Sequence, residues 1–314
     1  MPVTLRTTTK QHEVSARRVF ACIRNSAKQR LQKIKKINFM KKILFAAIVL
    51  AAGVLASCTP KPVDPYEGKT NPSTICQANL IAHFPFDGTP TELINNVEPK
   101  TVGTGVAYEK GRRGQAYKGA AKNELVYDAA AIKGINSLKD FSFACWMKHQ
   151  AVPQSSAPTP YFFGFTNTED FWGQLAFVLD RGGLDNTDSL AVKVAINGDM
   201  WAVPGLNPAF VAGRWTHVVA SFKVVDETHQ TLDLYVNGAP VEGLHWDFEE
   251  RPVTDFSRST MVLFGQWRQK ALEGATDEWM GDMDGDLDEV RLYNIALTAE
   301  EAKALYDAEI TVID

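Results

Sequence analysis

Two stretches of the chain, Leu190-Ala-Val-Lys-Val-Ala-Ile-Asn-Gly198 and Leu232-Asp-Leu-Tyr-Val-Asn-Gly238, decide the fold. In both, aliphatic residues alternate with polar or small ones, which is the period of a strand with one buried face. Each stretch ends in Asn-Gly, a pair that favours a tight hairpin because such turns need positive φ at both positions. The two stretches therefore predict strands that are paired by antiparallel hairpins.

Further short strands are expected along the rest of the chain, separated by turn residues. They lie near residues 80–86, 115–119, 140–149, 172–180, 214–224, 260–265 and 286–294. Many short strands in one chain favour an all-β fold, a two-sheet antiparallel sandwich. One short helix is expected at the carboxyl end, because Thr298-Ala-Glu-Glu301 forms a capping box before apolar residues at helical spacing. The segment 151–160 predicts an exposed loop.

Ahead of the strands, the segment from Met40 to Cys58 has the layout of an export signal. Two lysines precede an apolar run, residues 43–56, which is shorter than the roughly 20 residues that a membrane-spanning helix needs. The segment resembles a bacterial lipoprotein signal that is cleaved before Cys58 and lipidated on its thiol. We therefore expect an exported, membrane-anchored protein. Thr59, in place of an inner-membrane-retaining aspartate, favours the outer membrane or the cell surface.

The export signal divides the chain into four parts. Residues 1–39 are expected to be a misassigned start, because the charged region of a signal lies at the amino terminus; the alternative is a basic arm that binds nucleic acid. Residues 40–57 form the signal. Residues 58–78, rich in Pro, Thr, Lys and Asp, predict a flexible tether. Residues 79–314 are expected to form one domain.

The charge of residues 58–314 excludes some classes of partner. This part carries 36 of the 37 acidic residues and 21 of the 33 basic ones, a net charge of −15. Because such a surface repels phosphate groups, we expect no nucleic-acid partner, and contact with a membrane only through the lipid anchor. The acidic surface favours cation binding. Cys76 and Cys145 either pair in an oxidising compartment or leave Cys145 as a buried thiol in its apolar strand.

Segments in consistent order along the chain resemble the laminin-G-like, concanavalin A-like jelly-roll domains. They are Leu80-Ile-Ala-His-Phe-Pro-Phe-Asp-Gly88, Lys110-Gly-Arg-Arg-Gly-Gln-Ala116, Phe141-Ser-Phe-Ala-Cys-Trp-Met-Lys148, Gly213-Arg-Trp-Thr-His-Val-Val219 with Leu234-Tyr-Val-Asn-Gly238, and Asp288-Glu-Val-Arg-Leu-Tyr-Asn294 with Leu297-Thr-Ala-Glu-Glu301. The resemblance covers roughly residues 80–307. It implies a jelly-roll sandwich of a kind often used for glycan or protein recognition at cell surfaces.

The resemblance also implies a structural calcium ion near the first and last strands. Asp87 and Asp288 are the residues at the matching positions. Calcium takes 6–8 oxygen ligands, so backbone carbonyls and waters would have to complete the site. The alternative is that Asp87 supports a turn with Gly88 and that Asp288 accepts backbone hydrogen bonds.

Five of the seven tryptophans are candidates for a glycan-binding platform, because an aromatic ring stacks on the apolar face of a sugar. Trp146 and Trp215 lie in core-like strands and are expected to pack inside. The other five lie near turns or strand ends with polar neighbours: Trp172, Trp201, Trp246, Trp267 and Trp279. For each of them the alternative is that the ring only closes the edge of the sandwich.

These observations favour a lipid-anchored, non-catalytic protein of the cell surface that binds carbohydrate. The alternative is an adhesion or scaffold protein that binds another surface protein through the same loops. A glycoside hydrolase is less favoured. Asp284 could approach Asp282 or Asp286 as the second carboxyl, but the chain lacks the Glu-x-Asp-x-(x)-Glu strand of jelly-roll glucanases. Zinc-protease, serine-hydrolase and P-loop motifs are absent from the sequence.

Overall fold

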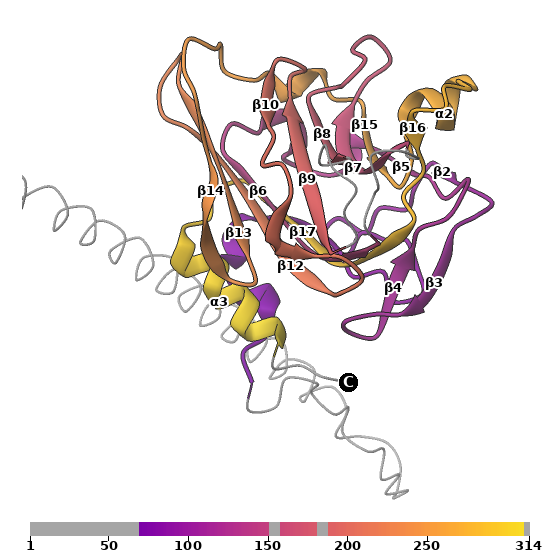
Figure 1. Cartoon of the computed structure of the whole chain (residues 1–314), viewed down its shortest axis with the longest axis horizontal. Coiled ribbons are helices and arrows are strands. Elements are labelled where there is room, and N and C mark those ends of the chain that lie inside the picture. Colours follow the sequence, from indigo (N-terminus) through magenta and orange to yellow (C-terminus); the bar gives the residue numbers. More distant parts are fainter. Residues whose placement is uncertain (1–68, 151–157, 181–187, 311–314) are drawn as a thin grey trace, which may run out of the picture. The chain divides into compact units, whose positions relative to one another are not determined.

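The computed structural model describes residues 69–150, 158–180 and 188–310 (Figure 1). The chain divides into two compact units, residues 1–78 and 79–314, and the second unit contains every strand of the described part. Cys58 and the predicted export signal lie outside the described residues. Within the described ranges, no helix is long and apolar enough to cross a membrane.

The first sheet has eight strands, all antiparallel to their neighbours. Their order is β14 (Ala239–Phe248), β13 (Gln230–Val236), β12 (Thr216–Val224), β6 (Phe141–His149), β17 (Gly285–Tyr293), β4 (Gln115–Lys118) and β3 (Ala107–Lys110), with β1 (Leu80–Phe84) also paired to β17. The first and last long strands of the domain therefore lie side by side in this sheet.

The second sheet has nine strands. Their order is β10 (Met200–Ala202), β9 (Ser189–Ile196), β8 (Leu175–Asp180), β7 (Thr159–Thr166), β15 (Met261–Phe264), β5 (Leu125–Asp128) and β2 (Thr101–Val102). Two short strands pair with the beginnings of longer ones: β11 (Asn207–Val211) pairs with β9, and β16 (Met280–Gly281) runs parallel to β7. The two sheets enclose one large apolar core, so the predicted two-sheet jelly-roll sandwich is confirmed.

Alternation along the strands builds this core. On β6, Phe143 and Cys145 face the interior, whereas Trp146 lies on the outer face of the first sheet. Phe143 stacks on Phe163 of the opposite sheet with ring centroids 4.4 Å apart. Cys145 is a buried thiol, one of the two states that the sequence left open, and burial raises its pKa well above the usual value.

The Asn-Gly pairs form the predicted turns. Asn197 and Gly198 have φ of 53° and 75°, and Asn237 and Gly238 have φ of 50° and 75°. These left-handed conformations are accessible to Asn and Gly and costly for most other residues. The first pair joins β9 to β10 and the second joins β13 to β14.

The described residues form few helices, and all are short. They are α2 (Arg268–Glu273), α3 (Ala299–Ile310) and the 3-10 turns Pro72–Thr74, Gln77–Asn79, Ala129–Ala131, Ile135–Ser137 and Phe256–Arg258. The predicted capping box starts α3: the Thr298 backbone N–H donates to Glu301, and the Glu301 N–H donates to the Thr298 hydroxyl at 3.2 Å. Figure 1 shows α3 beside β13 and β14 of the first sheet.

A buried charged cluster fastens α3 to the first sheet. Glu309 of the helix accepts a hydrogen bond of 2.7 Å from the Trp146 indole and pairs with Arg291 of β17, whose side chain is fully buried. Arg291 also pairs with Glu289 at 2.5 Å. Burial alone would raise the pKa of Glu289, but Arg291 and His83 outweigh it and hold the pKa at about 2. Arg113 lies 3.5 Å from Glu289 as well, so two arginines face the two glutamates of this cluster.

Candidate functional site

Four of the five candidate tryptophans come together on the outer face of the second sheet. Trp172 lies in the β7–β8 loop, Trp201 on β10, Trp267 directly before α2, and Trp279 directly before β16. The sheet beneath them contributes small and aliphatic residues that alternate with those of the main core: Val126, Ala176, Val178, Ala195 and Leu263. We call Phe171 and these four tryptophans the aromatic cluster.

The rings of the aromatic cluster contact one another edge to face, in tilted pairs and, between Phe171 and Trp279, in a stacked pair. Trp172 is central: its ring centroid lies 4.5 Å from that of Trp201, 5.2 Å from Trp267 and 5.3 Å from Phe171. Trp267 and Trp279 are 5.0 Å apart. Such pairs add about 0.5–1.5 kcal/mol each beyond the burial of their area. The cluster therefore holds its rings in defined orientations before any ligand arrives.

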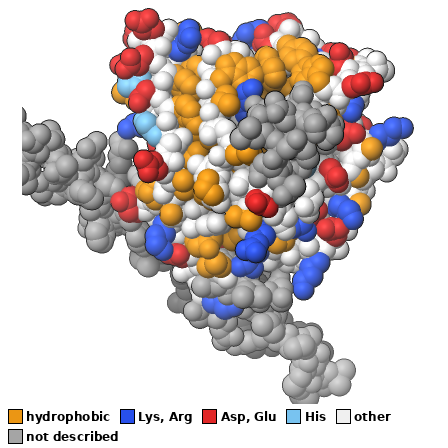
Figure 2. Space-filling model, viewed as in Figure 1, with side chains coloured by type: hydrophobic (Ala, Val, Ile, Leu, Met, Phe, Trp, Pro, Cys, Tyr) orange, Lys and Arg blue, Asp and Glu red, His pale blue; other side chains and the backbone are white. Residues whose placement is uncertain are grey.

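The members of the cluster differ in their access to solvent. Trp267 is 1% exposed and donates its indole N–H to the Thr159 carbonyl at 2.7 Å, so it supports the other rings from below. Trp172, Trp201 and Trp279 are half-buried, and Phe171 is 44% exposed. The view in Figure 2 shows hydrophobic side chains on the face of the molecule, with most of the charged side chains around its rim.

Polar side chains border the aromatic cluster. The Lys193 ammonium lies 4.7 Å from the centre of the Trp201 ring. On the other side, Asp282 accepts hydrogen bonds from Gln266 at 2.6 Å and from Lys270 at 3.0 Å. Apolar rings that are edged by hydrogen-bonding groups can contact both the carbon face and the hydroxyl groups of a sugar.

A buried polar network holds the loop that carries Phe171 and Trp172. Asn167 accepts from the backbone N–H groups of residues 169 and 170, both at 2.8 Å. Its amide donates to Asp170 at 2.9 Å, and Gln174 donates to the same carboxylate at 2.8 Å. Because this loop is tied to itself up to Gln174, directly before β8, its aromatic side chains are already ordered before a ligand binds.

Replacing Asn167 with alanine should loosen this loop. We expect a loss of about 1–3 kcal/mol in the free energy of unfolding, because buried partners of the amide are left unpaired. Ligand affinity at the aromatic cluster should fall as well, with the sheets intact by circular dichroism. Urea denaturation and calorimetry measure the two effects. A variant that keeps both stability and affinity would show that the network does not position the loop.

Trp246, the fifth candidate, lies elsewhere. It is on β14, opposite Leu232 of β13 in the first sheet, and packs partly buried against the main core. Of the two tryptophans that were expected to pack, Trp146 is buried under α3, and Trp215 is half-buried with the Lys148 ammonium 5.0 Å from its ring centre. From the sequence, only tryptophans were considered for the glycan-binding platform, so Phe171 was not among the candidates. In the sequence, only its position next to Trp172 could have indicated a role in the cluster.

Asp87 and Asp288 flank the same turn, the one between β3 and β4. Asp87 accepts from the Gln115 N–H and Asp288 from the Arg113 N–H, both at 2.8 Å. A Cβ on Gly114 would lie 2.1 Å from an oxygen of Asp87, so the turn approaches that carboxylate as only glycine allows. Asp288 thus accepts a backbone hydrogen bond, as expected under the alternative to calcium. Asp87 binds the β3–β4 turn, a contact that this alternative did not include.

The environment of Asp288 is unusual for a carboxyl group. Its side chain is fully buried, and its second oxygen, Oδ1, has no hydrogen-bond partner. Burial raises its pKa to about 8, and the nearby Glu289 and Asp87 add to the shift. Among the residues that the structure describes, no three His, Cys, Asp or Glu side chains are grouped to hold a metal. A cation at this turn would therefore need backbone carbonyls and waters besides the two aspartates.

The carboxyls considered for hydrolysis have three different surroundings. Asp282 is hydrogen-bonded to Gln266 and Lys270 beside the aromatic cluster. Asp284 is exposed, and Asp286 is buried and paired with Lys148 at 2.5 Å. Asp284 and Asp286 line the same pocket on the first sheet, away from the aromatic cluster.

Comparison with solved structures supports the same architecture. A mutant sialidase of Trypanosoma rangeli that displays trans-sialidase activity superposes with a TM-score of 0.53 at 14% identity, over 79% of this chain and 37% of that one. The binding domain of botulinum neurotoxin serotype D superposes with a TM-score of 0.52 at 12% identity. This alignment covers 73% of this chain and 51% of that one. The chain thus spans about half or less of these two structures.

A third structure aligns over nearly its whole length. Domain 4 of an extracellular arabinanase from Geobacillus stearothermophilus, in complex with arabinotriose, gives a TM-score of 0.45 at 20% identity, over 73% of this chain and 98% of that one. No functionally curated protein matches the sequence.

A family profile identifies the domain. The Laminin_G_3 profile, described as the concanavalin A-like lectin/glucanases superfamily, matches residues 125–303. This range contains every strand from β5 to β17 and the aromatic cluster. The chain therefore belongs to the concanavalin A-like lectin/glucanase superfamily, as a member with a laminin-G-like domain.

Proposed function

We propose that this protein is a non-catalytic carbohydrate-binding protein whose aromatic cluster contacts the glycan. One observation carries the proposal: Trp172, Trp201 and Trp279 present half-buried rings on one sheet face, held in place by the buried Trp267. Rings that are already ordered lose little freedom on binding, and each can cover the apolar face of one sugar unit. Membership in a superfamily of lectins and glucanases is consistent with this use of the fold.

We also propose that the protein is attached to a membrane by a lipid on Cys58. An anchored chain with a tether over residues 58–78 would hold the domain at the outer membrane or the cell surface, where polysaccharides are met. The test of the binding function is calorimetry of the full chain in detergent against a panel of neutral and acidic polysaccharides, with calcium and with chelator. Saturable binding to at least one polysaccharide is expected. A blank panel under both conditions would overturn the proposal.

A protein partner is the second candidate, and one observation favours it. Leu272 of α2 is 43% exposed, and α2 begins directly after Trp267 of the aromatic cluster. Phe171, whose carbonyl accepts from Gln269 of α2 at 2.8 Å, adds a second exposed apolar side chain to this area. Exposed apolar groups that adjoin one another are typical of protein interfaces. Binding of a surface protein that is lost in Leu272→Asp, together with a blank glycan panel, would favour this candidate.

We further propose that Asp87 and Asp288 hold a structural calcium ion. The buried, unpartnered Oδ1 of Asp288 supports it, because a hard cation satisfies such an oxygen. Gly111 and Gly114 support it too, since a Cβ at either position would lie within 2.5 Å of one of these carboxylates. When bound, the ion would tie the end of β1 and the β3–β4 turn to β17.

Calcium should therefore raise the melting temperature of the protein. At a concentration 100 times its dissociation constant, a bound ion stabilises the folded state by about 2.7 kcal/mol. Differential scanning calorimetry with calcium and with chelator measures the effect. Asp288→Asn should abolish the calcium-dependent shift, whereas Asp307→Asn on the exposed side of α3 should keep it. An identical melting temperature with calcium and with chelator would refute the calcium site.

A further inference from the structure

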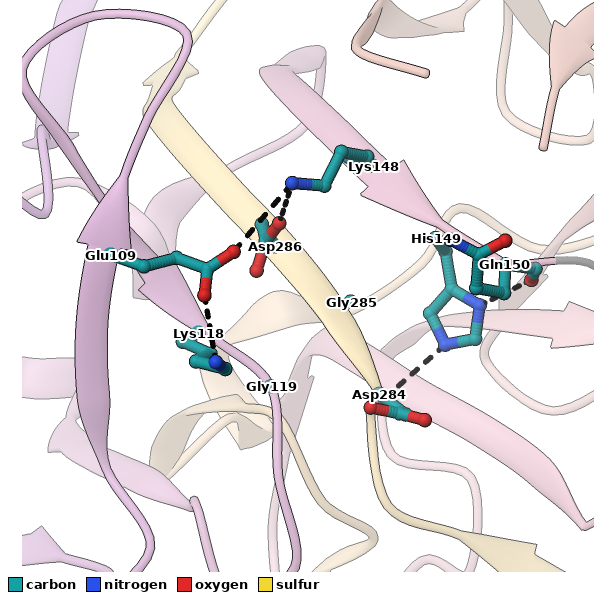
Figure 3. Close-up of a pocket in the computed structure, with 9 residues that line it drawn as sticks. All are labelled: Glu109, Lys118, Gly119, Lys148, His149, Gln150, Asp284, Gly285 and Asp286. Carbon is teal, nitrogen blue, oxygen red and sulfur yellow. Dashed lines mark hydrogen bonds and ion pairs between the residues drawn. The ribbon is translucent and has the colours of Figure 1, made fainter. Parts of the chain in front are cut away.

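A polar pocket of about 290 Å³ lies on the outer face of the first sheet. Its lining comes from β3, β4, β6 and the start of β17, together with the loop residues Gly119, Gln150 and Asp284 (Figure 3). Lys148 and Asp286 project into it, while their neighbours Met147 and Leu287 face the main core. Because the core of the sandwich separates the two outer faces, this pocket is distinct from the aromatic cluster.

Glycines make room for the pocket. A Cβ on Gly119 would lie 2.4 Å from the Gly285 carbonyl, and a Cβ on Gly285 would lie 2.4 Å from the Lys148 carbonyl. Only glycine therefore fits at these two positions, and backbone atoms line this part of the pocket. Figure 3 shows Gly285 between two sets of side chains: Glu109, Lys118, Lys148 and Asp286 on one side, and His149, Gln150 and Asp284 on the other.

The first set is electrically balanced. Asp286 is 4% exposed and stands directly opposite Lys118 on β4 and Lys148 on β6. Lys148 binds Asp286 at 2.5 Å, and Glu109 lies 2.7 Å from the Lys118 ammonium and 3.6 Å from that of Lys148. Because each lysine already has a carboxylate partner, a charged ligand would have to break one of these pairs to gain its own.

The second set fixes the orientation of Asp284. The ring of His149 contacts the Gln150 carbonyl through Nδ1 at 2.6 Å and accepts the Asp284 backbone N–H through Nε2 at 3.2 Å. These two contacts define the neutral tautomer with the proton on Nδ1. The exposed carboxylate of Asp284 at the edge of the pocket is thereby left to accept hydrogen bonds from a ligand.

We propose that this pocket is a second ligand site, which takes one unit of an uncharged sugar. Hydroxyl groups both donate and accept, so they can bond to the carboxylates and the lysines while the ion pairs stay intact. The volume of about 290 Å³ lies just below the range of roughly 300–1,000 Å³ that is usual for ligand pockets, which suits a single sugar unit rather than a chain. The inference stands without the proposed function of the aromatic cluster.

Two sites on opposite faces have a consequence for binding. A domain with one site per face can bridge two glycan chains, and a chain that reaches both sites gains apparent affinity through effective concentration. The two sites would also differ in selectivity, because the aromatic cluster contacts the apolar face of a sugar and the pocket contacts its hydroxyl groups.

Saturation-transfer difference NMR and calorimetry on the full chain in detergent test the proposal, with glucose, galactose, mannose, xylose, arabinose and N-acetylglucosamine as probes. We expect at least one neutral monosaccharide to bind saturably. Asp284→Ala should weaken its binding at least tenfold, which is about 1.4 kcal/mol. The matched control Asp307→Ala, an exposed aspartate on α3, should bind as the unmodified chain does.

A second variant and two charged probes separate this site from the aromatic cluster. Lys118→Gln should weaken monosaccharide binding even if Asp284→Ala lowers stability, and glucuronic acid and glucosamine, added as charged counterparts, should bind more weakly than the neutral sugars. The proposal is overturned if no neutral monosaccharide binds, if only glucuronic acid or glucosamine binds, or if Asp284→Ala and Lys118→Gln both bind as the unmodified chain does.

Discussion

Replacing Trp172 with alanine is expected to weaken glycan binding at the aromatic cluster by about 30-fold or more. Trp172 is the ring that contacts Phe171, Trp201 and Trp267, so its removal takes away one stacking surface and leaves the others without their central neighbour. Central aromatic residues of interfaces commonly cost 2 kcal/mol or more when truncated, which corresponds to this factor. Calorimetry with the polysaccharide that binds the unmodified chain measures the change.

Trp246→Ala is the matched control for this experiment. It removes the same side chain from β14 of the other sheet, so it should alter stability without altering affinity. Phe171→Ala provides a milder test, because this exposed ring can be removed at little cost to folding. The assignment of the aromatic cluster fails if Trp172→Ala binds as tightly as the unmodified chain, or if Trp246→Ala weakens binding equally.

Replacing Glu309 with alanine should cost about 3–5 kcal/mol in the free energy of unfolding, because one partner of a buried charged pair is removed and the other is left. Arg291 is fully buried and would lose the carboxylate that faces it from α3. The Trp146 indole N–H would lose its acceptor as well, and His217 a carboxylate neighbour at 3.3 Å. Urea denaturation, monitored by tryptophan fluorescence, measures this loss of stability.

Asp307→Ala serves as the control on the same helix. Asp307 is exposed and pairs with Lys303 one turn away, an interaction worth about 0.3–0.5 kcal/mol. Its loss should leave stability nearly unchanged. If Glu309→Ala costs less than about 1 kcal/mol, then α3 is held mainly by apolar packing and the buried charges contribute little.

Much of the fold could be predicted from local sequence. The alternating residues around Val192 and Leu234 and the two Asn-Gly pairs predicted strands and hairpins that the structure contains, because both signals depend only on neighbours along the chain. The capping box at Thr298 is equally local, and it starts α3.

The local sequence pattern did not predict the central strand of the second sheet. β7, Thr159–Thr166, contains Pro160 and Gly164, and the expected exposed loop over residues 151–160 is wrong at its end, where Thr159 and Pro160 begin the strand. Proline and glycine are poor strand formers in isolation. Pairing with β8 and β15 on the two sides overrides that preference, and neither partner lies within the local window.

The candidate site shows the same division. Residue type and nearby turns made five tryptophans candidates from the sequence: Trp172, Trp201, Trp267, Trp279 and Trp246. These criteria do not distinguish a tryptophan near a turn of one sheet from a tryptophan near a turn of the other. Only the tertiary structure decided that the first four share one face while Trp246 lies in the other sheet. It also brought Phe171 into contact with Trp279, which lies more than a hundred residues further along the chain.

The sequence by itself determined the features that depend on short-range pattern: the strand period, the turns, the cap of the last helix and the family resemblance. The tertiary structure alone decided which side chains share a surface, because strand order and sheet face depend on pairings between distant segments. The pocket around Gly285 illustrates this, since Glu109, Lys148 and Asp286 come from three strands that meet only in the folded sheet. Pairing between distant strands therefore decides where functional side chains come together, whereas the local sequence pattern decides where strands and turns form.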